Sequence, residues 1–149
     1  MSEQLSSTDR PDPHPYLYHL VEAVHWQALN SAQHQPAIYY PPTYEQDGFT
    51  HATADPALLL TVANHFYRAI PGEWLCLQMT VAGIEATGPR VIFEQRAPVG
   101  DTEADFDTAS STLFPHIYGG IRSDCVEALF PVRRDDKGTF TAIIGLNNH

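Results

Sequence analysis

The chain has 149 residues, and its 18 Asp and Glu against 8 Lys and Arg give a formal net charge of −10. Proteins that bind a phosphate backbone or an anionic membrane use clustered Lys and Arg, which eight scattered cations do not supply. We therefore expect neither bulk nucleic acid nor a membrane as a partner.

Composition divides the chain into three segments. Residues 1–15 are polar and rich in proline, which is typical of a disordered N-terminal arm. Residues 16–134 carry the apolar patterns of a single globular domain, and 43% of the whole chain is hydrophobic. Residues 135–149 are expected to form a C-terminal turn and a short extension.

The first half of the domain combines short strands with helices. Residues 16–21 (YLYHLV) are nearly all apolar or aromatic, which predicts an inner strand. A helix is expected over 21–30, with an apolar stripe made of Val21, Val24, Ala28 and Leu29. Residues 30–47 are mostly polar and interrupted by prolines, so they predict a long irregular connection. Residues 48–53 (GFTHAT) predict a second strand.

A second helix should begin after Asp55, because Asp caps free backbone amides and Pro56 suits the first helical position. We expect this helix to extend to about Tyr67 and to bury one stripe, made of Leu59, Val62, Ala63 and Phe66. Strands are predicted over 74–81, 91–95, 113–121 and 125–132, with an acidic loop at 98–111 and a short apolar piece at 140–146. Early helices followed mostly by strands indicate an α+β fold.

The cysteines point to a reducing compartment. Cys76 and Cys125 are too few for a disulfide framework, and Cys76 lies in an apolar run. The N-terminal residues lack the apolar segment of a signal sequence, and no stretch approaches about 18 apolar residues. We therefore expect a cytoplasmic protein.

Several common kinds of site lack their motif. The acids of the 98–111 loop have the spacing of a calcium loop, but Phe106 and Thr112 occupy the places where Gly and Glu are needed. The sequence contains no HExxH or CxxC motif of a zinc site and no GxSxG elbow of a nucleophilic serine. It also contains no glycine-rich loop of a phosphate-binding site. We expect the acidic loop to be solvated.

Histidine is unusually frequent, with eight copies. His19, His51 and His116 each lie on a strand face that is otherwise apolar or aromatic. One such residue is most simply a core histidine with hydrogen-bond partners, but each buried imidazole needs partners for two nitrogens. Polar groups that converge between aromatic walls are typical of a small-molecule pocket. The sequence therefore favours a pocket that contains these histidines.

Short motifs along the chain resemble the domain of unknown function 952 family. In chain order they are YHLV with His19, Trp26, GFTHAT with His51, VANHFY with Asn64, Glu94, and FPHIYG with His116. The resemblance covers about residues 16–132, and FPHIYG is its most specific part. In GFTHAT, Thr53 stands where the family has serine, which keeps a hydroxyl in place.

This resemblance implies a fold and a ligand. The family is grouped with the ADP-ribosyltransferase-like superfamily, which implies a split, bent mixed β-sheet with a few helices around a nucleotide cleft. In such transferases a first-strand His or Arg holds a ribose of NAD, and a late Glu stabilises a positively charged ribose. By resemblance His19 is the candidate for the first role and Glu94 for the second. NAD or a related nucleotide is the implied substrate, and no bound cofactor is assigned.

The leading hypothesis is a protein that binds a nucleotide or NAD-like small molecule and acts on it as a transferase. His19 and Glu94 are its expected catalytic residues. Its expected ligand-binding residues are His51, Thr53, Asn64, His116 and Tyr118. In this hypothesis the imidazoles hold ribose hydroxyls or phosphate. The relatives that the resemblance implies also include RNA 2'-phosphotransferases. The basic residues with which such enzymes hold an RNA phosphate have no clear counterpart here, since only Arg68, Arg90, Arg96 and Arg122 are available.

Two alternatives stay open. The chain would be a non-catalytic binding module if it kept the cleft and lost the chemistry. It would be a metal-dependent hydrolase if the three histidines met around a metal ion.

Overall fold

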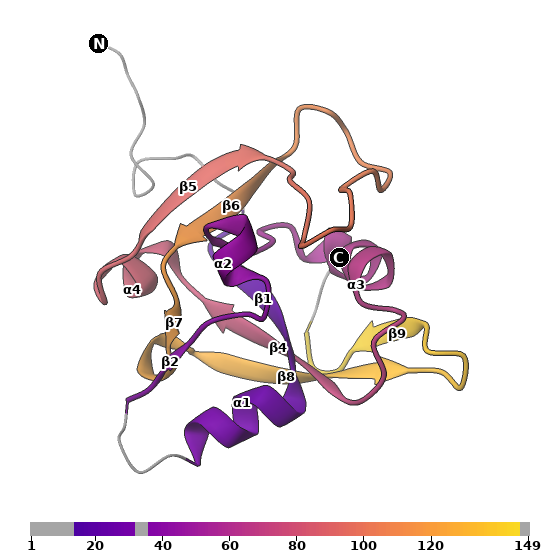
Figure 1. The fold of residues 1–149 in the computed structure, drawn as a ribbon, viewed down its shortest axis with the longest axis horizontal. Helices are drawn as coiled ribbons and strands as arrows, with labels where there is room; N and C mark the ends of the chain where they lie inside the picture. The colour runs from indigo at the N-terminus through magenta and orange to yellow at the C-terminus, as the bar shows by residue number, and fades with distance from the viewer. Residues whose placement is uncertain (1–13, 32–35, 147–149) are drawn as a thin grey trace.

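The computed structural model describes residues 14–31 and 36–146 (Figure 1). In this part of the chain three antiparallel sheets combine with a few short helices, so the expected α+β class is confirmed. The expected mixture of parallel and antiparallel strands is wrong for the described residues, because every strand pair there is antiparallel. The N-terminal arm expected over 1–15 lies almost entirely outside the described residues.

The largest sheet has four strands in the order β1-β4-β8-β9. Its members are β1 (Leu17–Glu22), β4 (Trp74–Met79), β8 (Ala128–Arg134) and β9 (Phe140–Ile143). The C-terminal piece expected as an extension thus pairs with β8 at the edge of this sheet. Alternate residues of β4 enter two different hydrophobic clusters: Leu77 and Met79 lie in one, and Trp74 and Cys76 in the other. Both faces of β4 are therefore covered.

A second sheet has three strands in the order β3-β6-β5. They are β3 (Thr50–His51), β6 (Leu113–Tyr118) and β5 (Arg90–Gln95). The two sheets are joined where Tyr18 and Thr53 exchange backbone hydrogen bonds of 2.8 and 2.9 Å. This junction brings β1 next to the residues that follow β3.

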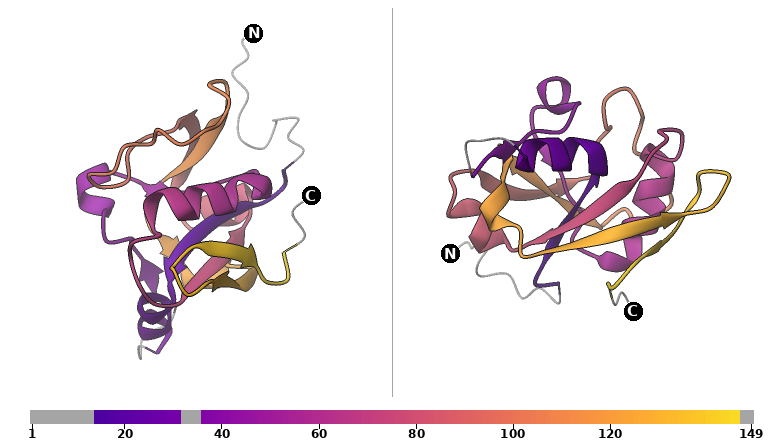
Figure 2. Two further views of the ribbon diagram at one scale, coloured as in Figure 1. Left: turned by 90° about the vertical axis from the view of Figure 1, so that its right-hand side faces the viewer. Right: turned by 90° about the horizontal axis from the view of Figure 1, so that it is seen from below.

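A two-stranded ladder and the helices complete the described structure. The ladder pairs β2 (Ile38–Tyr39) with β7 (Ile121–Arg122). The helices are α1 (Ala23–Asn30), α2 (Tyr44–Asp47), the 3₁₀ turn Pro56–Leu58, α3 (Leu59–Phe66), α4 (Val81–Glu85) and the 3₁₀ turn Ser123–Cys125. Helix α3 lies beside β1 and β9 (Figure 2). None of the helices in the described residues has the length and apolarity needed to cross a membrane.

The helix that follows Asp55 forms as predicted. The Asp55 carboxylate accepts a hydrogen bond from the amide of Ala57 at 2.9 Å, and Pro56 occupies the first helical position. Leu59 and Ala63 of α3 are fully buried. The start and the inner face of this helix could therefore be read from the sequence.

The predicted apolar stripe of the first helix is wrong. Val24 is 64% exposed, whereas Trp26, outside the predicted stripe, is only 6% exposed. Trp26 packs edge-on against Tyr39 of β2, with 6.0 Å between ring centroids. The position of β2 decides which side of α1 is inner, and β2 lies in the segment predicted as an irregular connection.

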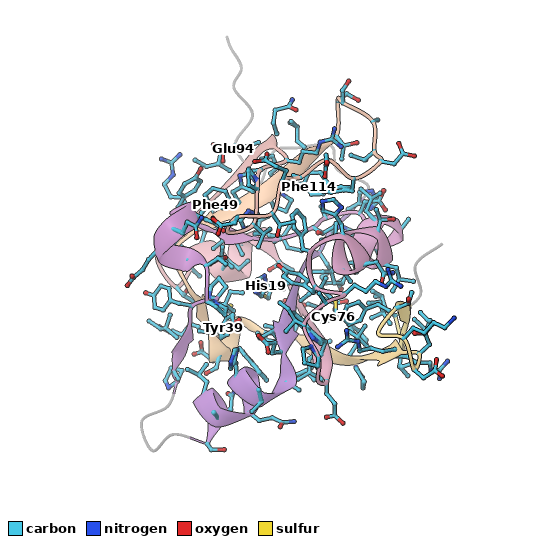
Figure 3. The ribbon with its side chains drawn as sticks, turned by 45° about the vertical axis from the view of Figure 1, so that its right-hand side comes forward. His19, Tyr39, Phe49, Cys76, Glu94 and Phe114 are labelled. Atoms are coloured by element: carbon cyan, nitrogen blue, oxygen red, sulfur yellow. The ribbon has the colours of Figure 1, made fainter. Side chains whose placement is uncertain are left out.

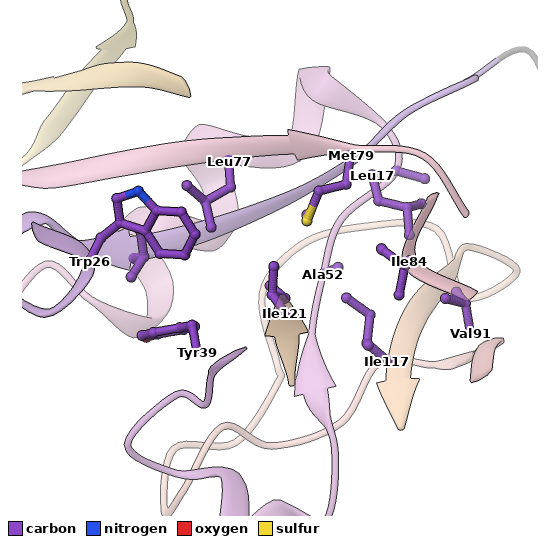
Figure 4. Packing of buried hydrophobic residues seen from close by; sticks show 12 residues of the cluster. Leu17, Trp26, Tyr39, Ala52, Leu77, Met79, Ile84, Val91, Ile117 and Ile121 are labelled. Atoms are coloured by element: carbon purple, nitrogen blue, oxygen red, sulfur yellow. The ribbon is translucent and has the colours of Figure 1, made fainter. Parts of the chain in front are cut away.

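Helix α4 was not predicted, because the strand was expected to continue through Val81. Thr80 ends the strand instead, and its hydroxyl accepts a hydrogen bond from the amide of Gly83 at 2.9 Å. The side chain of Ile84 then enters the main core, between the two sheets (Figure 4). Trp26 and Tyr39 lie at one end of that cluster, and Val91 lies at the other.

Candidate functional site

A small cavity lies where the two larger sheets meet. Residues of β1, β6 and α3 line it, together with the segment that follows β3 and the loop between β5 and β6, residues 96–112, here called the cover loop. Most of the lining is apolar, including Leu20, Val62, Phe66, Phe106 and Phe114. Its volume of about 30 Å³ leaves room for one or two water molecules. No Asp or Glu of the described residues lines it.

The structure brings the three predicted histidines to this cavity. His19 comes from β1, His51 from β3 and His116 from β6. His51 and His116 are directly paired residues of neighbouring strands, so their side chains lie on the same face of the sheet. His19 lies near the centre of the molecule (Figure 3). The prediction that these side chains converge on one pocket therefore agrees with the geometry.

His19 is a neutral imidazole with one hydrogen bond. Its Nδ1 lies 2.6 Å from the carbonyl oxygen of His51, which can only accept, so Nδ1–H donates and the proton is on Nδ1. The residue is 3% exposed, and burial lowers the pKa of His19 to about 4. At neutral pH its Nε2 therefore carries a lone pair and no hydrogen.

His116 has the same tautomer for a different reason. Its Nδ1–H donates to Glu94 Oε1 at 2.7 Å, and its ring stacks on Phe49 with 4.1 Å between centroids. Burial lowers the pKa of His116, although the Glu94 carboxylate opposes this effect. The His116 ring is therefore neutral at neutral pH, and its Nε2 also presents a lone pair.

Glu94 is held by two donors at the rim of this arrangement. Partial burial alone would raise its pKa, but the hydrogen bonds from the Tyr118 hydroxyl, at 2.5 Å, and from His116 outweigh burial, so the pKa of Glu94 is lowered. The same bond to Glu94 raises the pKa of Tyr118 to about 12. Glu94 and Tyr118 do not line the cavity. Glu94 contacts it only through His116.

His51 holds the cover loop. Its Nε2–H donates to the carbonyl oxygen of Pro98 at 2.9 Å, and its Nδ1 lies 3.6 Å from a carboxylate oxygen of Asp47. Burial lowers the pKa of His51, and the nearby Asp47 carboxylate opposes this effect. The Asp47 carboxylate also accepts from the amide of Gly100. The side chain of His51 thus attaches the cover loop to β3.

The Nε2 atoms of His19 and His116 differ from most buried polar atoms. Each is buried and has no hydrogen-bond partner in the part of the chain that the structure describes. A buried polar atom left unpaired costs roughly 1–3 kcal/mol, and such atoms are rare in folded proteins. Both of these atoms belong to histidines that line the same cavity.

Two further predicted site residues have different positions. Thr53 lines the cavity and joins the sheets through its backbone. Asn64 lies away from the cavity, on the side of α3 that contacts β9. Its amide donates to the carbonyl of Phe140 at 3.0 Å and accepts from the Phe140 amide at 2.7 Å. Both ends of this side chain are occupied, so Asn64 attaches the edge strand to α3.

No motif in the sequence predicts that the cover loop forms one wall of the cavity. Arg96, Ala97, Val99 and Phe106 of this loop are lining residues. Phe106 is buried against Phe66 and Phe114. One signal was available: Phe106 is the only large apolar residue in a run of acids. A phenylalanine in such a loop is often anchored in a core.

The three histidines do not form a metal site. Within residues 14–31 and 36–146, no group of three or more His, Cys, Asp or Glu side chains has the arrangement needed to hold a metal ion. His51 donates from Nε2 to the carbonyl of Pro98, so this nitrogen is not available to a metal ion beside the free Nε2 atoms of His19 and His116. The hydrolase alternative therefore lacks a ligand set in the described residues.

Comparisons with known proteins identify a family of unknown function and a solved structure of similar fold. A family model described as a protein of unknown function, DUF952, matches residues 20–129. The crystal structure of protein CC0527 from Caulobacter crescentus aligns with a TM-score of 0.61 at 17% identity, covering 85% of this chain and 93% of that one. A double mutant of CC0527 gives the same values. No curated protein matches the sequence. The structural likeness shows a shared fold.

Proposed function

The chain belongs to the DUF952 family of proteins of unknown function, and we propose that it binds a small hydroxylated molecule in the cavity. The ribose of a nucleotide or NAD-like compound is the candidate that the site favours. His19 and His116 are the residues that accept its hydroxyl groups.

The two free Nε2 atoms carry this proposal. A neutral imidazole protonated on Nδ1 can only accept at Nε2, so each position calls for a donor. Adjacent hydroxyl groups, as in ribose, supply two donors on one small ring. An ionised phosphate has no hydrogen to donate. Of the two ligand groups expected from the sequence, hydroxyl and phosphate, the hydroxyl therefore suits these histidines.

The resemblance of the sequence motifs, which implies an ADP-ribosyltransferase-like fold, is a second argument for ribose, since it does not depend on the cavity. His19 on the first strand is the residue that this resemblance assigns to ribose binding. The cavity of about 30 Å³ is far smaller than a nucleotide site of a few hundred Å³. The rest of a nucleotide would therefore remain outside, and the cover loop would move to admit the sugar.

The Glu94–His116 pair supports a catalytic role in addition to binding. A carboxylate that accepts from Nδ1–H fixes the imidazole tautomer and stabilises the ring when Nε2 takes up a proton. His116 would act as a general base: it would accept the proton of a bound hydroxyl as that oxygen bonds to an electrophilic centre and displaces a leaving group, which departs with the bonding electron pair. Glu94 is in this scheme a positioning residue, and not the direct partner of a cationic sugar that the resemblance implies.

Thermal denaturation with D-ribose, ADP-ribose, NAD and AMP tests the proposal. A compound present at about 100 times its Kd adds about 2.7 kcal/mol, or roughly 5–10 °C in Tm for a chain of this size. The His116→Phe variant keeps an aromatic ring against Phe49 and removes the acceptor, so the shift should disappear. The matched control is His25→Phe on the exposed side of α1, which should retain it.

The outcomes separate binding from catalysis. A shift that persists in His116→Phe, or the absence of a shift with every ribose compound, would overturn the proposed binding. Binding without turnover of NAD or ADP-ribose would leave a binding module, which is the non-catalytic alternative.

A further inference from the structure

Arg96 is the only Lys or Arg among the described residues that lines the cavity. One hydrogen bond holds its side chain: Nη1–H donates to the carbonyl oxygen of Phe106 at 2.6 Å. The guanidinium also lies over the Phe106 ring, 5.4 Å from its centroid. These contacts keep the group at the cavity wall and use a small part of its donor capacity, because a guanidinium has five N–H donors.

No carboxylate neutralises this charge. Among the described residues Arg96 forms no ion pair with an Asp or Glu, although the chain has 18 acids and the cover loop carries Asp101, Glu103, Asp105 and Asp107. Arg122, by comparison, is paired with Asp124 through bonds of 2.7 and 2.9 Å. The cavity therefore holds an unpaired cation in a protein with a large excess of negative charge.

We propose that the ligand is a hydroxylated anion, whose hydroxyl groups bind His19 and His116 and whose carboxylate or phosphate binds Arg96. This inference rests on the proposed function and adds the chemical class of the ligand. The two histidines alone would not favour an anionic group, because their free nitrogens accept hydrogen bonds.

The polarity of the site fixes which end of the ligand goes where. The imidazole lone pairs would repel an ionised oxygen, so the anion cannot lie against Nε2 of either histidine. Arg96 only donates, and its planar fork matches the geometry of a carboxylate or phosphate. His19 and His116 are 3% and 2% exposed, whereas Arg96 is half-buried. The hydroxyl end should thus enter first, with the anion nearer to solvent.

Calorimetric titration of the full chain with three probes tests the inference. D-Ribose is the neutral probe, D-ribose 5-phosphate carries a phosphate ester, and D-gluconate carries a carboxylate. We expect at least one anion to bind about tenfold more tightly than ribose or better, which corresponds to one charge-assisted contact. The two anions distinguish phosphate from carboxylate as the natural group.

Variants of arginine locate the effect. Arg96→Gln should reduce the affinity for the preferred anion to about that for ribose, and Arg96→Lys should restore part of the difference. Arg122→Gln is the control, because Arg122 lies outside this cavity. If Arg96→Gln fails to fold, the salt dependence of the wild type replaces it: added NaCl should weaken binding of the anion and not of ribose.

Failure of this inference differs from failure of the proposed function. Equal affinities of the wild type for all three probes, or an anion preference that persists in Arg96→Gln, would overturn the role of Arg96. Binding of ribose that still depends on His116 would then leave the proposed function intact. Binding of every probe that His116→Phe does not change would overturn the proposed function itself.

Discussion

The three histidines of the cavity differ in which ring nitrogen has a hydrogen-bond partner, and this difference separates their roles. His19 and His116 each donate from Nδ1 and leave Nε2 free, whereas His51 uses Nε2 to hold Pro98. The sequence showed three imidazoles on apolar strand faces, and that pattern was enough to predict that they converge. Which nitrogen is free depends on the carbonyl or carboxylate opposite each ring, and those partners come from distant segments.

The buried neutral state of His19 should make stability depend on pH. In the unfolded chain His19 titrates near 6.5, whereas in the folded protein its pKa is about 4. As the pH falls below 6.5 the unfolded state binds more protons than the folded state, so stability is lost until about pH 4. Between about pH 7 and about pH 5 the loss from His19 alone is on the order of 2 kcal/mol.

Urea unfolding of wild type and His19→Asn at both pH values measures this loss. Asn keeps a donor for the His51 carbonyl and cannot titrate, so its free energy of unfolding should fall less on acidification. His51 and His116 contribute equally to both proteins and cancel in the difference. An identical pH dependence in the two proteins would show that His19 is not a buried neutral group.

The Glu94 carboxylate should raise the pKa of His116 above the value that burial alone gives. Glu94→Gln keeps an oxygen that accepts from Nδ1–H and removes the negative charge, so the pKa of His116 should fall further. Titration of the His116 ring by NMR measures the change, with the exposed Glu127→Gln as the control. An unchanged pKa of His116 would mean that Glu94 does not act through it.

At the scale of elements, the sequence predicts structure that depends on contacts between neighbouring residues, and it does not predict structure that depends on contacts between distant elements. Asp55 and Pro56 start a helix through contacts with their own neighbours, so the sequence contains the whole cause. Trp26 is buried because of Tyr39, which belongs to a different element. The strand β9 was predicted only as an apolar piece, because its place depends on pairing with β8 and on α3.

Asn64 should stabilise the attachment of β9 to α3 without taking part in ligand binding. Asn64→Ala removes two hydrogen bonds to the backbone of Phe140 and leaves buried groups unpaired, which should cost about 1–3 kcal/mol of the free energy of unfolding. Thr61→Ala on the exposed side of the same helix is the control and should cost little. Loss of ribose binding by a folded Asn64→Ala protein would instead place Asn64 in the site.

For the whole molecule, the meeting of two sheets creates the site. Tyr18 and Thr53 join the sheets through backbone hydrogen bonds, which the side chains in the sequence do not reveal. The net charge of −10 argues against large clusters of cations, but it does not show that the cavity lining contains Arg96 and none of the described acids. The net charge is a sum over the whole chain, whereas a ligand in the cavity interacts with the charges of the residues that line it.

The protonation of the imidazole nitrogens, read by ¹⁵N NMR of the histidine side chains at about pH 7, tests the proposed site most directly. His19 and His116 should both show Nδ1–H with an unprotonated Nε2, and added D-ribose should shift the resonances of these two Nε2 nuclei while those of His25 stay unchanged. A proton on Nε2 of either ring, or Nε2 resonances that do not respond to ribose, would show that these histidines are not the acceptors of a hydroxylated ligand.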